Sequence, residues 1–584
     1  GKQIKSDIFT YNKKSKILTL KGNIFFKKGS QYFEAKKIYY NVKDESGYIE
    51  NIYGQIDSKT FKDDIGIDIN TQDSESLETD ISNLNILDEA SFGVTKELDT
   101  YKDFNFRIPE IVKWRFKSKK IYIKTNFLKS DEIFFTNDAF NEPQFFIESY
   151  NFVGEYNDEK VKFNSKNTWI NLDNRLKFPI GNSSFFDGQD SFTRWGFGYD
   201  NEDKDGLFIR RGSDAKKIFG NYNLKINSYF LLQRAIEGDT NSFDRQGKSL
   251  AGNELIYQNN LTDLFAIDTK LDGKIDTWNL DFKSSNNSLD PNKLSESTRI
   301  KLNIEKSIKL KPNNFLGKKS LSKNSFLNIK FSSSYREKIL KGFDGEEEIY
   351  WGNSFSLVNP NYREYKNQNI NYSLLYEFGQ FNAKSSDKEE LDSLIRNIFV
   401  SEFNQEIFLW RKKGLEETLN NQYKYSPQII SQGLTWKNTL KSGLFLYSND
   451  TSQKLISLST GPELTLGTLK SKFFDYTKLG AEATYIFKDG KSPFAFDDVN
   501  DSFRIRFNLE QQLYGAIGFN SETYLNLDNE DKDYGYFKES TFGLELKRRA
   551  YKIGVFYKPT AKSVGIKFNI FNFDYKGFAP SFKK

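Results

Sequence analysis

Apolar and polar residues alternate in short stretches through the last two-thirds of this chain. The clearest stretch covers residues 503–510, where Phe, Ile, Phe and Leu alternate with Arg, Arg, Asn and Glu. Side chains of a β-strand point alternately to opposite faces, so each stretch has one apolar face and one polar face. Many such strands, closed on themselves with the apolar face outward, form a barrel that crosses a membrane around a polar lumen. The pattern predicts such a barrel over residues 190–584.

The same pattern gives an estimate of the number of strands. Similar stretches lie at residues 265–271, 300–304, 481–487 and 564–570, and turns rich in Asn, Asp and Gly separate them. With about 15–18 residues for each strand and its turn, the region would hold on the order of 22–26 antiparallel strands, within the known range for such barrels. Arg504 and Arg506 would then face the lumen, where they are suited to contact phosphate.

The end of this region has the character of a membrane-insertion signal. Outer-membrane barrels typically end in an amphipathic strand with aromatic residues, which the barrel-assembly machinery reads. Phe568, Ile570 and Phe573 are the residues predicted to form that signal here. The alternative is a simple aromatic edge strand.

The composition is compatible with a barrel but does not establish one. Of the 584 residues 37% are hydrophobic, and no stretch approaches the ~18 uninterrupted apolar residues of a membrane helix. Compositional bias toward Lys, Asn, Ile, Phe and Tyr explains part of the aromatic content of 16%. Bias cannot place apolar residues at every second position, so their placement is the stronger evidence.

The chain contains neither Cys nor His. Disulfides, thiolate metal sites, His-ligated zinc and Ser-His-Asp chemistry are therefore excluded. The net charge is +6, and the basic residues are spread along the chain and not clustered, which argues against a nucleic-acid-binding surface. We expect no catalytic residue, no metal, no cofactor and no nucleic-acid partner, and we expect that the protein is not an enzyme.

A loose repeat marks the N-terminal region. A strand that ends in Tyr-Asn at residues 6–12 is followed by a second strand at residues 17–26, and the unit recurs at residues 34–41 and 47–56. Repeats of this kind indicate stacked strand pairs, each of which buries its apolar face against the next. One interpretation is an ordinary small β-domain, and the other is an open β-groove whose apolar interior carries acyl chains. An acidic stretch at residues 68–97 reads as an insert, so we expect one domain over residues 1–118.

The order of Asp, Tyr-Asn, an apolar strand, Gly-Asn-Ile and a second Tyr-Asn in residues 7–41 resembles the OstA-type repeat of lipopolysaccharide-transport proteins. A short repeat region followed by a long barrel region is similar to the LptD-type lipopolysaccharide-assembly family. The resemblance implies a periplasmic β-jellyroll followed by a barrel in the cell outer membrane. The implied function is a translocon that receives lipopolysaccharide or a related glycolipid and inserts it into the outer leaflet through a lateral gate. The implied partners are a periplasmic jellyroll protein of the same pathway and the barrel-assembly machinery. Whether a lipoprotein plug is a further partner is left open.

The resemblance also assigns residues to the transport path. Apolar and aromatic side chains of the repeat region are expected to hold the lipid tails inside the jellyroll, at Ile8, Leu18, Leu20, Ile24, Phe26, Ile38 and Tyr40. Burial of a tail gains about 0.8 kcal/mol per CH₂, so the tails would stay sheathed while the head group stays wet. No bond is made or broken in this process.

Residues 119–189 are predicted to form a transition from jellyroll to barrel. Proline cannot donate a ladder hydrogen bond, so it lies at sheet edges or strand ends. In the family a weakened seam beside the first barrel strand is the lateral gate, and Pro179 with Ile180 is the predicted position here. The alternative is that Pro179 only ends a loop. The family carries cysteines in this region and near its C-terminus, so their absence here indicates a divergent, cyanobacterial-like branch.

Two other functions are compatible with the pattern. The first is a generic large outer-membrane porin or receptor barrel, in which the N-terminal region is only a plug or linker. The second is a soluble extracellular β-repeat protein that binds a surface. A barrel-borne lipase or protease is a weaker alternative because the chain lacks His.

Overall fold

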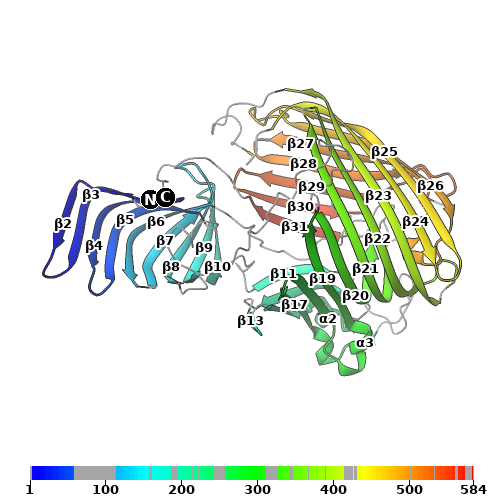
Figure 1. Cartoon of the computed structure of the whole chain (residues 1–584), viewed down its shortest axis with the longest axis horizontal. Coiled ribbons are helices and arrows are strands. Elements are labelled where there is room, and N and C mark those ends of the chain that lie inside the picture. Colours follow the sequence, from blue (N-terminus) through cyan, green and yellow to red (C-terminus); the bar gives the residue numbers. More distant parts are fainter. Residues whose placement is uncertain are drawn as a thin grey trace.

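The computed structural model of the chain is built from two large antiparallel β-sheets that follow one another in sequence (Figure 1). It describes residues 3–57, 113–125, 127–156, 161–185, 195–200, 203–213, 216–219, 222–240, 257–310, 326–340, 346–365, 367–388, 390–412, 425–426, 430–499, 502–531, 533–559, 563–571 and 582. The all-β architecture is the one that the alternation predicts. None of the helices in these residues has the length and apolar character needed to cross a membrane.

The first sheet, which we call the jellyroll, has ten strands. Neighbouring strands pair in the order β1-β3-β4-β5-β6-β7-β8-β9-β10, and β2 pairs with β3. The strands are β1 (Gln3–Lys5), β2 (Ile8–Asn12), β3 (Ile17–Lys28), β4 (Gln31–Asn41), β5 (Ser46–Asp57), β6 (Lys113–Lys124), β7 (Phe127–Thr136), β8 (Phe145–Tyr156), β9 (Val161–Leu172) and β10 (Leu176–Phe185).

The sequence repeat corresponds to the turns of this sheet. The side chain of Asn12 accepts hydrogen bonds from the backbone N–H groups of Lys14 and Ser15, and Asn41 makes the same type of turn with Lys43. These Tyr-Asn positions therefore end strands because asparagine satisfies the turn that follows. Gly22 has a φ of +90°, and a Cβ at this position would collide with the Asp7 side chain. The Gly-Asn motif therefore forms a bulge, in which the backbone N–H of Asn23 donates to the Asp7 carboxylate.

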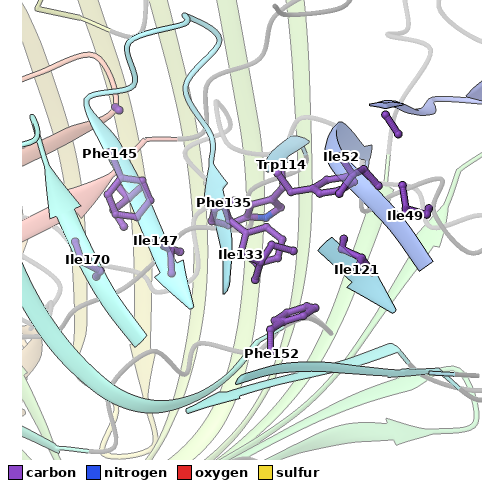
Figure 2. Close-up of a cluster of buried hydrophobic side chains, with 14 of the residues drawn as sticks. Ile49, Ile52, Trp114, Ile121, Ile133, Phe135, Phe145, Ile147, Phe152 and Ile170 are labelled. Carbon is purple, nitrogen blue, oxygen red and sulfur yellow. The ribbon is translucent and has the colours of Figure 1, made fainter. Parts of the chain in front are cut away.

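The interior of the jellyroll is a continuous apolar core (Figure 2). It is built from every second residue of successive strands, such as Ile133 and Phe135 in β7 or Phe145 and Ile147 in β8. The core continues through β6, β8 and β9 without interruption. Residues 119–189, predicted as a transition, are instead largely the second half of the jellyroll sheet, because β6 pairs directly with β5 across the acidic insert.

The second sheet has 19 strands among the described residues and runs from β11 to β31. These are β11 (Trp195–Asp200), β12 (Gly206–Gly212), β13 (Lys216–Ile218), β14 (Tyr222–Phe230), β17 (Phe265–Ile275), β18 (Trp278–Asn286), β19 (Thr298–Lys309), β20 (Phe326–Leu340), β21 (Glu346–Tyr365), β22 (Gln368–Lys384), β23 (Leu391–Arg411), β24 (Gly433–Tyr447), β25 (Ser452–Leu466), β26 (Thr477–Gly490), β27 (Phe503–Tyr514), β28 (Ile517–Asn526), β29 (Phe537–Lys547), β30 (Tyr551–Lys558) and β31 (Ser563–Ile570). The sheet curls round so that β11 and β31 approach one another (Figure 1). The described residues hold fewer strands than the estimated 22–26, because strands such as β21 and β23 reach 20 and 21 residues.

The two faces of this second sheet confirm a barrel with an apolar exterior. In β25 the side chains of Ile456 and Leu458 are exposed, while Ser457 and Ser459 between them are buried. A soluble sheet would bury the leucine and expose the serine. The apolar face therefore points out toward a membrane, and the polar face points into the lumen.

Turns alternate between the two ends of the barrel because successive strands run antiparallel. The turn between β29 and β30 lies against the jellyroll, and we call this end the jellyroll-side rim. The loops between β22 and β23, β24 and β25, and β26 and β27 consequently lie at the opposite end, the far rim. Short elements α2 (Leu232–Glu237), η2 (Leu261–Leu264), η3 (Pro291–Lys293) and α3 (Leu294–Ser297) also lie at the far rim, with the two-stranded sheet of β15 (Asp239–Thr240) and β16 (Tyr257–Gln258).

Candidate functional site

The two ends of the barrel sheet meet at a seam between β11 and β31. These strands approach one another, but the backbone pairing of the described strands runs only from β11 through to β31 and has no ladder between the two. Every other neighbouring pair in the sheet is joined by a ladder. Because ladder hydrogen bonds satisfy the polar backbone in a membrane, this seam is the weakest line in the described barrel wall.

The jellyroll core continues directly onto the barrel at this seam. The core cluster that contains Phe145 and Ile170 also contains Ala550, Tyr551 and Ile570, and Leu546 and Ile553 pack against it. Tyr551 and Ile553 alternate along β30 with Lys552, and they share the outward face of the exposed Val555. We call this continuous cluster the shared core. It connects the jellyroll interior to the outer face of β29–β31, without passing through the lumen.

A buried ion pair fixes the jellyroll to the barrel. The Arg549 guanidinium, in the turn between β29 and β30, contacts the Asp138 carboxylate through Nη2 at 2.7 Å and through Nε at 2.9 Å. Arg549 also donates to the carbonyl of Glu142 at 2.8 Å, and its backbone N–H donates to the Gln144 side chain. Arg549 and Asp138 are 3% and 1% exposed, so water does not screen the pair.

Further polar contacts lie beside this ion pair. The Asp173 carboxylate accepts from Arg548 at 2.6 Å and from the Tyr551 hydroxyl at 2.7 Å. The side chain of Asn137 donates to the carbonyl of Phe571, just after β31. Residues 137–144 and Asp173 therefore position β30 and β31 against the open end of the jellyroll. The pairings themselves leave no local signal in the sequence, because the partners are separated by more than 370 positions.

Six of the seven predicted lipid-contacting residues lie on the inner face of the jellyroll. Leu20 and Ile24 belong to the core, Leu18 and Ile38 pack against it, Phe26 stacks on Phe33, and Tyr40 pairs with Leu18. The prediction for Ile8 was wrong. Ile8 pairs with Lys21 and is 56% exposed, whereas Phe9 pairs with the core residue Leu20. Directly paired residues share a face, so Phe9 faces inward and Ile8 outward.

The predicted gate position lies in the jellyroll. Pro179 pairs with Trp169 in β10, the last strand of the first sheet, and the register shifts between Pro179 and Gly181. Pro179 therefore occupies an edge strand, where a missing N–H is tolerated. The strand ends well before β11, so Pro179 and Ile180 do not flank the barrel seam, contrary to the prediction.

The predicted insertion residues end in a buried position. Phe568 and Ile570 belong to β31, and Phe573 lies outside the described residues. Ile570 is 2% exposed and pairs with Tyr551 inside the shared core. The side chain of Ile570 thus packs against the jellyroll.

The lumen is lined with charges of both signs that pair with one another. Arg504 and Arg506 lie on the inner face of β27, as predicted, and Arg506 contacts Glu522 at 3.3 Å. Glu463 similarly contacts Lys437 at 2.9 Å and Lys478 at 3.3 Å. In the part of the chain that the structure describes, no group of acidic side chains is arranged to hold a metal ion. The lumen surface around these ion pairs is therefore polar and hydrogen-bonding, and unsuited to an acyl chain.

A loop at the far rim packs against the inner face of one part of the barrel wall. Residues 491–499, which we call the plug loop, include η7 (Ala495–Asp497). Phe494, Phe496 and Val499 of this loop pack in a buried cluster with side chains of β21–β26: Ile349, Val358, Leu375, Phe381, Ala383, Ile398, Val400, Phe445, Tyr447, Leu455 and Ile486. The plug loop is consequently part of the folded interior of the barrel.

An ionic triad anchors the plug loop. The Arg396 guanidinium of β23 contacts Glu377 of β22 and Asp497 of the plug loop, each at 2.5 Å. Arg396 also lies 4.3 Å from the ring of Phe381 and 5.0 Å from that of Phe496. Tyr447 donates to the second oxygen of Asp497 at 3.2 Å. Because all three charges are buried, removal of one would leave the others unpaired in an apolar cluster.

A second polar network holds the short elements of the far rim. The fully buried Arg234 contacts Asp205 at 2.5 Å and donates to the carbonyl of Asp263 at 2.9 Å. The Asp263 carboxylate accepts from Lys293 at 2.6 Å and from Ser288 at 2.5 Å. Burial raises the pKa of Asp263, but these hydrogen bonds outweigh burial and hold its pKa below the usual value.

These features define an all-β membrane barrel with an attached jellyroll that shares its core. Residues 109–574 match the family described as "Protein of unknown function (DUF3769)", and the chain belongs to this family.

Comparison with other proteins adds no functional evidence. No curated protein matches the chain. Two solved structures of OmpT, an outer membrane protein of Vibrio cholerae, are similar to it at 9% identity. The loop L8 deletion mutant has a TM-score of 0.24 over 68% of this chain and 92% of its own, and the trimer form has a TM-score of 0.25 over 66% and 92%. At TM-scores this low, neither similarity says anything about the fold or the function of this chain.

Proposed function

We propose that this protein is an outer-membrane translocon for lipopolysaccharide or a related glycolipid. The jellyroll would lie in the periplasm and receive the lipid, and the seam between β11 and β31 would release it sideways into the outer leaflet. An all-β barrel with an apolar exterior supports the outer-membrane location, because barrels of this kind are characteristic of that membrane.

The observation that carries the proposal is the shared core. The apolar interior of the jellyroll meets Tyr551, Ile553 and Ile570 on the membrane side of the barrel, and β31 is one wall of the seam. A lipid tail that moves along this surface avoids water at every step, which is worth about 0.8 kcal/mol for each CH₂ group. The head group would meet the polar lumen face, where Arg506 and its neighbours can exchange internal ion pairs for contacts to phosphate.

The plug loop supports lateral release over passage through the lumen. Its apolar cluster lies on the inner face of β21–β26 at the far rim and would narrow the lumen there. The generic porin, the alternative that the sequence leaves open, needs a continuous aqueous path through the barrel.

The outer end of the jellyroll supports a periplasmic partner with the same type of fold. Among the described strands, β1 and β2 pair only with β3, and Ile4, Phe9 and Tyr11 are exposed there. An edge of this kind accepts a further strand by main-chain hydrogen bonding. A partner jellyroll added at this edge would extend the apolar interior toward the source of the lipid.

Photo-crosslinking in Gram-negative cells tests the proposal. A photoreactive residue at Phe26 faces the jellyroll interior, and one at the adjacent Phe25 faces outward with Tyr32. A second pair compares Ile553 on the outer face of β30 with Lys552 on the lumen face. We expect glycolipid to be captured at Phe26 and Ile553 and not at Phe25. Absence of glycolipid at Phe26, or equal capture at Phe25, would overturn the proposal.

A further inference from the structure

The chain returns to the jellyroll after β31, and Phe582 is buried there at 2% exposure. Its neighbours are Tyr32, Tyr53, Phe134 and Phe146, which form an aromatic cluster separate from the inner core. Phe134 alternates along β7 with the core residues Ile133 and Phe135. The cluster therefore lies on the outer face of the jellyroll, where an aromatic surface would otherwise meet water.

Two cations and an aromatic ring surround Phe582. Its ring lies edge-on to Tyr53 with centroids 6.0 Å apart, and the Arg115 guanidinium lies 5.2 Å from its centroid. Lys117 lies 5.9 Å from the ring and donates to the backbone carbonyl of Phe582 at 3.1 Å. We call this site, with the aromatic cluster around it, the Phe582 seat. Its residues come from β4 to β8, so it is complete only when those strands have paired.

The Phe582 seat is connected to the buried ion pair at the barrel junction. Arg115, itself fully buried, donates to the carbonyls of Asp138 at 2.5 Å and Phe140 at 2.8 Å. Asp138 is the residue that binds Arg549 of the barrel. One arginine therefore contacts Phe582 on one side and supports, on the other, the segment that holds the barrel.

We propose that the seat is the docking site for the segment that follows β31, with Phe582 as its anchor, and that its occupancy holds the jellyroll in position against β29–β31. The occupant is the chain's own Phe582. Phe571 is already fixed to Asn137, and the eleven residue-to-residue steps from 571 to 582 span up to ~36–40 Å when extended. A desolvated cation–π contact also favours an aromatic anchor over an aliphatic one. This inference stands on packing alone and does not depend on the cargo.

Paired cysteines test which Phe582 occupies the seat, since the chain has none of its own. Full-length protein in lipid vesicles carries Lys117→Cys with Ser581→Cys, the residue before Phe582, so that the Phe582 ring is kept, and is treated with a short bismaleimide. We expect a crosslink within one chain. The matched control places the first cysteine at Lys43, an exposed turn residue of the jellyroll, and gives none. Crosslinked dimers, or no crosslink from Lys117→Cys, would overturn the proposal.

A second measurement tests the coupling to the junction. In Phe582→Ala, amide hydrogen exchange of residues 137–144 should accelerate roughly 10- to 30-fold, as expected for the loss of one desolvated cation–π contact. Exchange in β20–β26 should not change, which also shows that the barrel has folded. Phe537→Ala removes an exposed ring of the same size and should leave residues 137–144 unchanged. Unaltered exchange of residues 137–144 in Phe582→Ala would contradict the coupling.

Discussion

In β8 of the jellyroll, Phe145 and Ile147 point into a dry core, whereas in β25 of the barrel Ile456 and Leu458 point outward and serines point inward. Both strands alternate, but the apolar side chains point inward in β8 and outward in β25. The difference arises from the surroundings, which are water for the jellyroll and a membrane for the barrel. Alternation therefore defines two faces of a strand, and the surroundings decide which of them is inside.

The inward apolar face of the jellyroll and the outward apolar face of the barrel meet in the shared core. There the inner face of the jellyroll packs against the outer face of β29–β31, so the two apolar surfaces form one. Variants that act differently on the two regions can test this arrangement.

The largest expected effect is on the barrel lumen. Replacement of the plug loop, residues 491–499, by a short Gly-Ser linker removes the apolar side chains that pack against β21–β26 at the far rim. We expect planar-bilayer recordings to change from closed to conducting, while the jellyroll is unaffected. The double variant Asn449→Ala/Thr451→Ala alters an exposed turn of the same rim and should stay closed. Equal conductance in all three proteins would show that the plug loop does not block the lumen.

The next largest effect is expected at the junction. Arg549→Met leaves Asp138 buried without its barrel partner, which costs about 3–5 kcal/mol for a broken buried pair. Arg548→Met removes a neighbouring, more exposed pair with Asp173 and should cost about 1 kcal/mol or less. Denaturant unfolding of the jellyroll in the intact protein measures both. Equal losses would mean that burial of the Arg549 pair does not matter.

A smaller effect distinguishes the two faces of the barrel wall. Leu458→Arg places a charge on the outer face and should destabilise the inserted barrel by about 2–4 kcal/mol if that face meets lipid. Asn404→Arg places the same side chain at a similar depth on the lumen face and should cost about 1 kcal/mol or less. Folding into vesicles from urea gives both values. The reverse order would contradict the assigned faces.

The smallest effect is a pH dependence of the far rim. The pKa of Asp263 is lowered in the folded protein, so its contribution to stability is complete above its unfolded pKa of about 4 and is lost as pH falls through the folded value. Exchange protection factors of residues 287–297 should therefore hold from neutral pH to about pH 4 and decline below it. Lys293→Met removes a hydrogen bond to the carboxylate and should move that decline to higher pH. An unchanged profile would show that Lys293 does not set the titration.

Sequence reasoning identified the strands well because period-two placement survives in the sequence itself. Residues 503–510 fall within β27, and Arg504 and Arg506 occupy the lumen face. It failed where register or distant partners decide. Ile8 was placed on the wrong face because its pairing with Lys21 cannot be read from the strand alone.

The remaining features depend on contacts across the fold. Pro179 was assigned to the barrel because the pattern gives no sign that β10 still pairs within the jellyroll. The Arg549–Asp138 pair and the triad around Arg396 join distant strands and a loop, so neither is a motif. The plug loop contains Phe494, Phe496 and Val499, but a stretch this short does not reveal from sequence whether it packs inside the barrel or lies on the surface.

The shared core has a consequence for making the protein. Tyr551 and Ile570 are buried in the full chain. A barrel produced without residues 3–185 would expose both side chains at its rim, beside an Arg549 without its Asp138 partner. Such a fragment would aggregate or bind to chaperones. Each half exposes apolar surface when the other is missing, so the jellyroll and the barrel have to be expressed and folded together as one unit.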